Sequence, residues 1–143
     1  LLHHEAHTAT FLPLFDQAHK GDVDAALAAV GARIDALGGT FDVLILGMGG
    51  DGHTASFFPG GDNLEAALDP KGGKTVLSMR APDAGEPRIT LTLPKVLATR
   101  ALYVHIEGAD KKAILAKAEA GEDYPIGAVL KHATVPVEIY WAP

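Results

Sequence analysis

The sequence predicts an α/β protein with a mostly parallel sheet and flanking helices. Stretches with helical spacing alternate along the chain with short apolar runs, hairpin signals are scarce, and one apolar run leads directly into a glycine-rich loop. The chain has 143 residues, of which 48% are hydrophobic and 21% charged, so extensive disorder is not expected. We expect residues 1–143 to form a single α/β domain.

The first predicted element is a helix over residues 22–37. Leu27, Val30, Ile34 and Leu37 recur at steps of three and four, which places them on one face of a helix. Asp22 is a suitable N-cap residue, and two glycines follow the other end, where helices commonly stop.

A short strand is predicted next, at residues 41–46. This run is almost continuously apolar and is flanked by glycines. Such runs are typical of strands in parallel sheets that are covered by helices on both faces. We therefore expect this strand to be buried on both faces.

The rest of the chain continues the alternation of helices and strands. Further helices are predicted at 63–68, 94–99 and 110–119, and further strands at 75–79, 89–93, 101–107 and 135–140. Pro136 indicates the start of a strand or an edge strand, because proline cannot donate a ladder hydrogen bond. Tyr140 and Trp141 are expected to close the core at the last strand.

Charge and composition argue against several classes of function. Twelve Lys and Arg against eighteen Asp and Glu give a net charge of −6, which is unfavourable for nonspecific nucleic-acid binding. The absence of cysteine excludes disulfides, cysteine-ligated metals and a thiol nucleophile. No apolar run approaches the ~18 residues of a membrane-spanning helix, and the first residues do not read as a signal peptide.

The loop at residues 47–56 combines glycines with an acid and a base. It follows the strand at 41–46, and ligands of open α/β sheets bind beyond the carboxyl ends of strands. Its glycines allow backbone N–H groups to approach an anion or an oxyanion closely. Asp51 and His53 add a carboxylate and an imidazole suited to general-base catalysis. The loop is therefore a candidate site for an anionic or carbonyl ligand.

Two other interpretations of this loop compete with a ligand site. Gly47, Gly49 and Gly52 match the spacing of the dinucleotide-binding fingerprint, which also requires a long helix and an acidic strand end about 20 residues later. Residues 59–61 (PGG) interrupt such a helix, and the next strand ends in Ser-Met-Arg, so this interpretation is disfavoured. A plain glycine turn is the other alternative, although it would require neither an acid nor a histidine.

Residues 41–60 (FDVLILGMGGDGHTASFFPG) resemble the central motif of the 6-phosphogluconolactonases. Residues 87–94 (PRITLTLP) are similar to a second segment of that family, and 108–111 (GADK) to a third at a strand-to-helix junction. The three segments occur in the family's order. The resemblance extends over residues 11–141.

The resemblance implies both a fold and a function. The implied fold is shared with glucosamine-6-phosphate deaminase and ribose-5-phosphate isomerase. The implied reaction is the hydrolysis of 6-phospho-D-glucono-1,5-lactone to 6-phosphogluconate in the cytoplasmic pentose phosphate pathway, without a metal or cofactor. The expected partner is thus a phosphosugar lactone, with no nucleic acid and no membrane.

The resemblance also implies roles for individual residues in catalysis. His53 would be the general base that takes a proton from the attacking water, and Asp51 would orient it. A second possibility for Asp51 is a capping role, in which it accepts hydrogen bonds from loop amides. The N–H groups of Gly49 and Gly50 would hold the oxyanion.

Arg88 and Lys111 would bind the phosphate group, because a guanidinium fork and an ammonium both suit a phosphate dianion. Lys111 lies near the start of a predicted helix, where free N–H groups attract anions. Lys112 replaces it if the register slips by one residue. A solvated surface charge is the alternative for each cation.

The chain departs from its relatives in two respects. Glucosamine-6-phosphate deaminases carry a glutamate five residues after the motif histidine, where this chain has Phe58, so deaminase activity is the less favoured alternative. Members of the family are also longer, with a further phosphate loop in an N-terminal part. We expect the chain to be a C-terminal portion with an exposed apolar sheet edge or face, covered by an N-terminal segment or by self-association. A non-catalytic fragment or binding remnant is the functional alternative.

Overall fold

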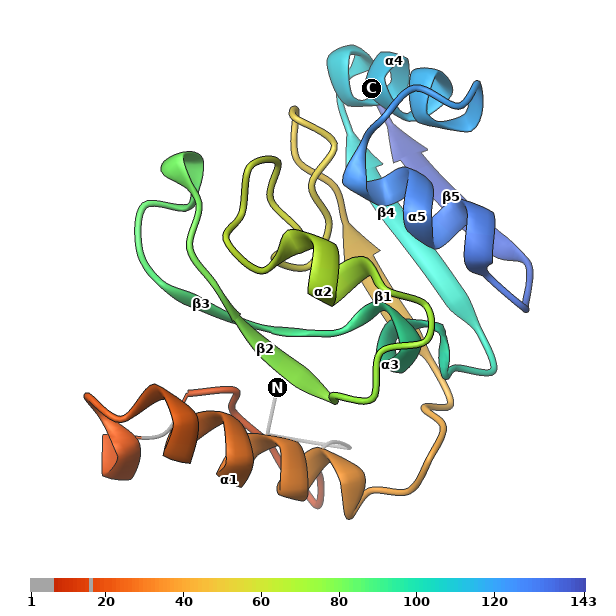
Figure 1. The fold of residues 1–143 in the computed structure, drawn as a ribbon. Helices are drawn as coiled ribbons and strands as arrows, with labels where there is room; N and C mark the ends of the chain where they lie inside the picture. Colours follow the sequence, from red (N-terminus) through yellow and green to blue (C-terminus); the bar gives the residue numbers. More distant parts are fainter. Residues whose placement is uncertain (1–6, 16) are drawn as a thin grey trace.

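The centre of the fold is a three-stranded parallel sheet. A computed structural model describes residues 7–15 and 17–143 of the chain. The strands are β1 (Leu44–Gly47), β4 (Leu102–Glu107) and β5 (Val137–Ala142), in the order β1-β4-β5 (Figure 1). Leu46 pairs with Val104, which in turn pairs with Ile139. The carboxyl ends of all three strands therefore meet at one edge of the sheet, which confirms the predicted parallel arrangement.

A second, two-stranded sheet is antiparallel. It consists of β2 (Val76–Met79) and β3 (Arg88–Leu91), with Val76 opposite Leu91. The connection at 80–87 contains a short 3-10 helix at Pro82–Ala84 and none of the two-residue turns that mark tight hairpins. This pairing was therefore not evident in the sequence.

The helices pack around these two sheets. They are α1 (Val23–Asp35), α2 (Leu64–Leu68), α3 (Leu93–Leu97), α4 (Ala109–Glu119) and α5 (Pro125–His132), preceded by a short 3-10 helix at Gln17–His19. Figure 1 shows α4 and α5 beside β4 and β5, whereas α1 lies at the opposite end of the molecule, next to β2.

The three-stranded sheet is buried on one face. Leu46, Val104 and Ile106 on that face are at most 6% exposed and belong to the larger of two hydrophobic clusters. On the other face, Val43 is 54% and Ile45 68% exposed. The prediction of a strand buried on both faces is thus wrong, because α4 and α5 cover only one face.

The end of the last strand also differs from the prediction. Tyr140 is 55% and Trp141 40% exposed, so neither closes the core. The strand begins immediately after Pro136 and forms an edge of the sheet, as the proline indicated. Tyr140 pairs with His105 on the open face of the sheet, and Trp141 lies at the end of the strand against the start of α4, so neither side chain reaches the core.

Helix α1 packs on β2 through the smaller hydrophobic cluster. Val30 and Ile34 contact Val76 there, which confirms the predicted apolar face. Asp22 is the N-cap, and its side chain accepts a hydrogen bond from Ala25 N at 3.0 Å. The helix ends two residues earlier than predicted, so the prediction that Leu37 belongs to this face is wrong: Leu37 lies exposed in the following turn.

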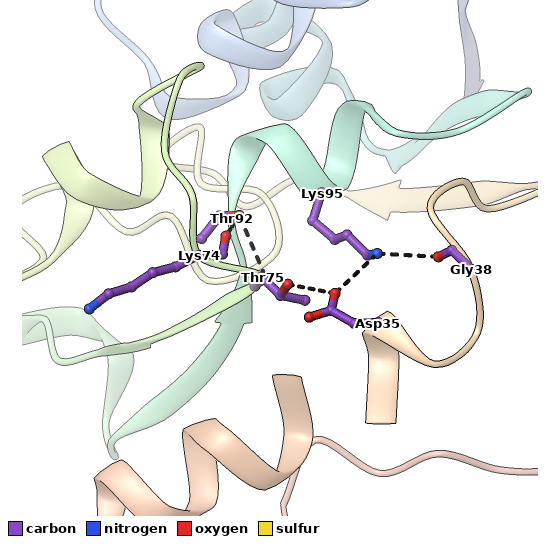
Figure 2. Close-up of polar contacts among 6 residues, drawn as sticks. All are labelled: Asp35, Gly38, Lys74, Thr75, Thr92 and Lys95. Atoms are coloured by element: carbon purple, nitrogen blue, oxygen red, sulfur yellow. Dashed lines mark hydrogen bonds and ion pairs between the residues drawn. The ribbon is translucent and has the colours of Figure 1, made fainter. Parts of the chain in front are cut away.

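Polar contacts fasten the end of α1 to the neighbouring elements (Figure 2). The Thr75 hydroxyl donates to Asp35 Oδ1 at 2.7 Å. The Lys95 ammonium lies 3.6 Å from the same carboxylate oxygen and donates to Gly38 O at 3.5 Å. Residues from α1, from α3 and from the position just before β2 thus meet at one carboxylate, which we call the Asp35 cluster.

Helix α5 was not predicted from the sequence. Pro125 occupies its first turn, a favoured position for proline, and Ile126 and Val129 are fully buried. The helix spans eight residues and includes Gly127, so its apolar spacing is too short to be recognised without the rest of the fold. The remaining predicted elements are present with boundaries shifted by a few residues.

Candidate active site

The loop after β1 is held in shape by its own backbone. Gly49 N donates to His53 O at 2.9 Å, and Gly52 N donates to Gly49 O at 3.1 Å. The hydroxyl of Thr54, which is fully buried, donates to Gly47 O at 2.8 Å. These bonds connect the two ends of the loop at the carboxyl end of β1, so its backbone conformation is fixed and its side chains have defined positions.

At two positions of this loop, neighbouring side chains leave no room for a Cβ atom. A Cβ atom on Gly49 would lie 2.3 Å from the His53 ring and 2.7 Å from Asp51 Oδ1, well inside van der Waals contact. A Cβ atom on Gly52 would lie 2.6 Å from the Tyr124 ring, and its φ of +77° further favours glycine. The side chains of Asp51 and His53 therefore occupy space that only glycine at position 49 leaves open.

Asp51 and His53 form a hydrogen-bonded dyad. Asp51 Oδ1 lies 2.6 Å from His53 Nδ1 and also accepts the His53 backbone N–H at 3.1 Å. Partial burial acts to raise the pKa of Asp51, but the two hydrogen bonds from His53 and its nearby charge outweigh it and lower that pKa below its usual range. An ionised Asp51 holds the imidazole proton on Nδ1, which leaves Nε2 as a proton acceptor.

Phe58 packs against the imidazole of this dyad. The ring centroids of His53 and Phe58 are 4.3 Å apart, with the ring planes tilted by 33°. Phe58 is 8% exposed and belongs to the larger hydrophobic cluster, so core packing holds its ring in place beside the imidazole. Asp51 is thus the acid that contacts His53, while an apolar ring packs against the imidazole.

A cavity of about 440 Å³ lies beside the loop and brings together residues from β1, the loop and α4. It is lined by Ile45, Leu46, Gly47, Met48, Gly49, His53, Ala55 and Lys111. Because β1 and β4 are parallel neighbours, the loop after β1 and the helix after β4 begin at the same edge of the sheet. This topology places Lys111, in the first turn of α4, in one cavity with His53.

Two predicted site residues lie elsewhere. The Arg88 guanidinium donates to Ala84 O at 3.0 Å and lies 3.4 Å from Glu86, and Arg88 does not line the cavity of His53. Gly50 is exposed at the tip of the loop and is also not among the lining residues. The structure therefore unites His53, Asp51, Gly49 and Lys111, but not Arg88.

Ala55 is a feature of the cavity that the sequence did not reveal. Its φ is +49°, in the left-handed region that costs a residue with a side chain about 1–2 kcal/mol. It lines the cavity beside His53, and strained residues of this kind cluster at functional sites. No local sequence signal marks an alanine for this conformation.

The other features of the described residues lie apart from this site. A larger cavity of about 790 Å³ lies between α4, α5 and β5 and contains neither His53 nor Asp51. Across residues 7–15 and 17–143, no group of three or more metal-ligating side chains is close enough to hold an ion. Within the same residues, no helix is both long and apolar enough to cross a membrane.

The fold and the dyad define an α/β protein with an acid–base site at the carboxyl edge of a parallel sheet. A family model described as glucosamine-6-phosphate isomerases/6-phosphogluconolactonase matches residues 1–141. The chain belongs to this family, which confirms the resemblance noted in the sequence.

Individual relatives agree with the family assignment. The chain is 49% identical to a 6-phosphogluconolactonase of Rhizobium meliloti (strain 1021) and 44% identical to one of Mesorhizobium japonicum. Each match covers the whole of this chain but only 62% and 60% of those relatives. A crystal structure of a 6-phosphogluconolactonase from Shewanella baltica OS155 superposes with a TM-score of 0.90 at 31% identity, covering 99% of this chain and 60% of that one.

Proposed function

We propose that the protein hydrolyses 6-phospho-D-glucono-1,5-lactone to 6-phosphogluconate in the cytoplasmic pentose phosphate pathway. The observation that carries this proposal is the Asp51–His53 dyad in contact with a cavity that also contains Lys111. The dyad supplies a base for water, and the ammonium supplies a counter-charge for a phosphate group. The names of the relatives support the same activity.

His53 is the general base in this proposal. Its Nε2 takes a proton from a water molecule as the water oxygen forms a bond to the lactone carbonyl carbon. The tetrahedral intermediate then collapses, the bond between that carbon and the ring oxygen breaks, and the same proton passes from Nε2 to the departing ring oxygen. The products are a carboxylic acid, which ionises in water, and a hydroxyl group on the opened chain.

Backbone N–H groups of the glycine loop stabilise the oxyanion of this intermediate. Gly49 N already donates to His53 O, so we assign the oxyanion contact chiefly to Gly50, whose N–H must turn from its exposed position toward the bound lactone. The role of Gly49 is then to leave room for the dyad. The two glycines thus contribute in different ways to the same step.

Lys111 is the principal phosphate ligand in this proposal. It lines the cavity of His53 from the first turn of α4, where backbone N–H groups add to the attraction for an anion. Arg88 contributes only after a change of side-chain rotamer, since its guanidinium is bonded to Ala84 and Glu86. No metal and no cofactor take part in the proposed reaction.

A non-catalytic binding role is the second candidate function. The chain spans 62% and 60% of the length of the first two relatives, and one sheet face is open at Val43 and Ile45.

We propose that residues 1–143 act as one α/β domain, because Leu91 packs against both hydrophobic clusters. Either a further segment or a second copy of the chain would cover the open face.

Hydrolysis of freshly prepared lactone, corrected for spontaneous opening, tests the main proposal. The His53→Ala variant is expected to lose roughly 10²-fold or more of the rate, as for a lost general base. His132→Ala is the matched control, because this histidine ends α5 and does not line the cavity of His53. Equal rates in the chain and in His53→Ala would remove His53 from the mechanism, and a chain no faster than background would favour the binding role.

A further inference from the structure

Trp141 makes a specific contact with the start of α4. Its indole N–H donates to Gly108 O at 3.0 Å, from a side chain that is 40% exposed. One residue further on, Ala142 O accepts the Gly108 N–H at 2.8 Å. The last strand therefore holds Gly108 at both of its backbone polar groups.

Gly108 is the residue at which α4 begins. It is the N-cap of the helix, with a φ of +91° that favours glycine. Its carbonyl accepts the Lys112 N–H at 3.3 Å, which is the first bond of the helix, as well as the indole N–H. The indole bond thus acts on the residue that sets the position of the first helical turn.

The two lysines of this turn have different environments. The Lys112 ammonium lies 3.7 Å from the centroid of the Trp141 ring, within the range of a cation–π interaction. Lys111 lines the cavity of His53. Consecutive residues of a helix point about 100° apart, so a helix fixed at Gly108 cannot present both side chains in one direction.

We propose that Trp141 is a positioning residue for the anion-binding end of the site. Its indole N–H fixes the start of α4, and its ring retains Lys112, so that Lys111 is the cation that faces His53. This inference rests on the proposed function in taking the substrate phosphate as the ligand of Lys111. It also explains why an exposed indole makes polar contacts with a helix terminus instead of filling the core.

Acylation of lysines, followed residue by residue by mass spectrometry, tests without substrate whether Trp141 retains Lys112. An ammonium in contact with an indole ring must leave that ring before the reagent can approach it freely, so Lys112 should react more slowly than Lys117, a lysine of the same helix with no such contact among those described. Trp141→Ala should raise the Lys112 rate about threefold or more and leave Lys117 unchanged. A Lys112 rate that is the same in both proteins would overturn the proposal.

Kinetics with the lactone test the consequence for binding. Trp141→Phe keeps a ring but removes the N–H donor to Gly108. We expect it to raise KM about 3- to 10-fold with kcat within about twofold, because phosphate binding is weakened and the dyad is untouched. Tyr140→Phe is the matched control on the same strand, since its hydroxyl contacts only Glu138 among the described contacts, at 3.5 Å. It should leave both constants unchanged.

An unchanged KM in Trp141→Phe, or a fall in kcat alone, would overturn the positioning role even if Trp141→Ala fails to fold. Failure of the proposed function gives a different pattern. A chain without lactonase activity counts against hydrolysis, whereas the acylation rates of Lys112 and Lys117 still decide the role of Trp141.

Discussion

At the scale of single residues, the site depends on the space and the charge around His53. Gly49 leaves the space that the imidazole and the Asp51 carboxylate occupy, and Phe58 packs against the imidazole ring. The carboxylate fixes the tautomer through a 2.6 Å contact with Nδ1. Small changes at these neighbours should therefore alter the chemistry more than the stability.

Replacement of Gly49 by alanine is expected to displace the dyad. The new methyl group would lie 2.3 Å from the His53 ring, and the ring must shift to accommodate it. A misplaced base loses on the order of 10²-fold in rate. Lactone hydrolysis measures the effect, with circular dichroism to show that the fold persists.

Gly39→Ala is the matched control for this variant, since a Cβ atom there has no neighbour within 4 Å and the residue lies outside the cavity. It should hydrolyse the lactone at the parent rate. Full activity in Gly49→Ala would show that the position of His53 in the loop is not required.

The lowered pKa of Asp51 predicts a dependence of stability on pH. A carboxyl group whose pKa is lower in the folded than in the unfolded state stabilises the fold above its unfolded value, near 3.8, and this contribution is lost as the pH falls through the folded pKa. Urea unfolding of the chain and of Asp51→Asn at several pH values measures it. The stability difference between the two should be constant from pH 5 to 7 and shrink below about pH 4.

Asp83→Asn serves as a control for the general effect of removing a carboxylate. Asp83 is exposed and lies in the 3-10 helix Pro82–Ala84, about 30 residues after the dyad along the chain. Its stability difference from the parent should vary little over the same pH range. A difference for Asp51→Asn that is equally independent of pH would show that the dyad does not stabilise the folded state.

At the scale of elements, α1 is attached to the rest of the molecule at a few positions. Its apolar face meets β2 through Val30 and Ile34, and its last residue contributes the carboxylate of the Asp35 cluster. The Lys95 side chain in that cluster is 11% exposed, so its ammonium is shielded from water more than a typical surface lysine. The end of α1 is thus held by polar contacts and its middle by apolar ones.

Thr75→Val is expected to weaken this attachment. Valine keeps the shape of threonine but removes the hydroxyl that donates to Asp35, which should lower the free energy of unfolding by about 0.5–1.5 kcal/mol. Thermal or urea unfolding measures the change. Thr134→Val is the matched control at an exposed threonine that follows α5, and it should change stability by less than about 0.5 kcal/mol.

A double-mutant cycle with Asp35→Ala assigns the effect to the pair. If the hydroxyl acts through Asp35, Thr75→Val should cost less in the Asp35→Ala background than in the parent. Strictly additive changes would mean that the Thr75 hydroxyl contributes nothing through this bond.

At the scale of the whole molecule, the three-stranded sheet has one covered and one open face. Val43, Ile45 and Tyr140 are each more than half exposed on the open side. Neighbouring apolar side chains of this kind mark surfaces that other polypeptide covers. The open face is therefore where the chain is expected to associate.

Ile45→Lys should reduce such association. A charged side chain on the open face would make the burial of this face unfavourable. Sedimentation or light scattering over a range of concentrations measures the molecular mass, and binding of a hydrophobic dye measures the exposed apolar surface. Both should fall relative to the parent chain.

Leu37→Lys is the comparison variant, because Leu37 is 63% exposed in a turn away from this sheet. It should associate as the parent does. A parent chain that stays monomeric at all concentrations and binds no dye would contradict the prediction.

Local sequence signals predicted most of the individual elements. Asp22 and the apolar spacing after it located α1, and Pro136 located the start of β5. The open face of β1 was expected only from the greater length of the family's members and not from the strand itself, since an apolar run shows that a strand can be buried but not which elements are there to bury it. Helix α5 was missed for a related reason, because three buried residues in eight positions do not establish a period.

The site was partly predictable for a physical reason. The dyad of Asp51 and His53 is local, so its spacing in the sequence already indicated it. The meeting of His53 with Lys111 depends on the parallel pairing of β1 with β4, which the sequence alone does not specify. The contacts that hold Arg88 away from this cavity, and the positive φ of Ala55, likewise depend on the folded chain.

The position of Trp141 has an optical consequence. It is the only tryptophan of the chain, so indole fluorescence reports on the junction of β5 with α4 alone. Its partial exposure should give emission at longer wavelength than that of a buried indole. Helix α1 lies in a different hydrophobic cluster, and its melting is visible only in the far-ultraviolet dichroism. Coincident fluorescence and dichroism transitions on heating would show that both ends of the molecule unfold together, and separated transitions that they unfold as two units.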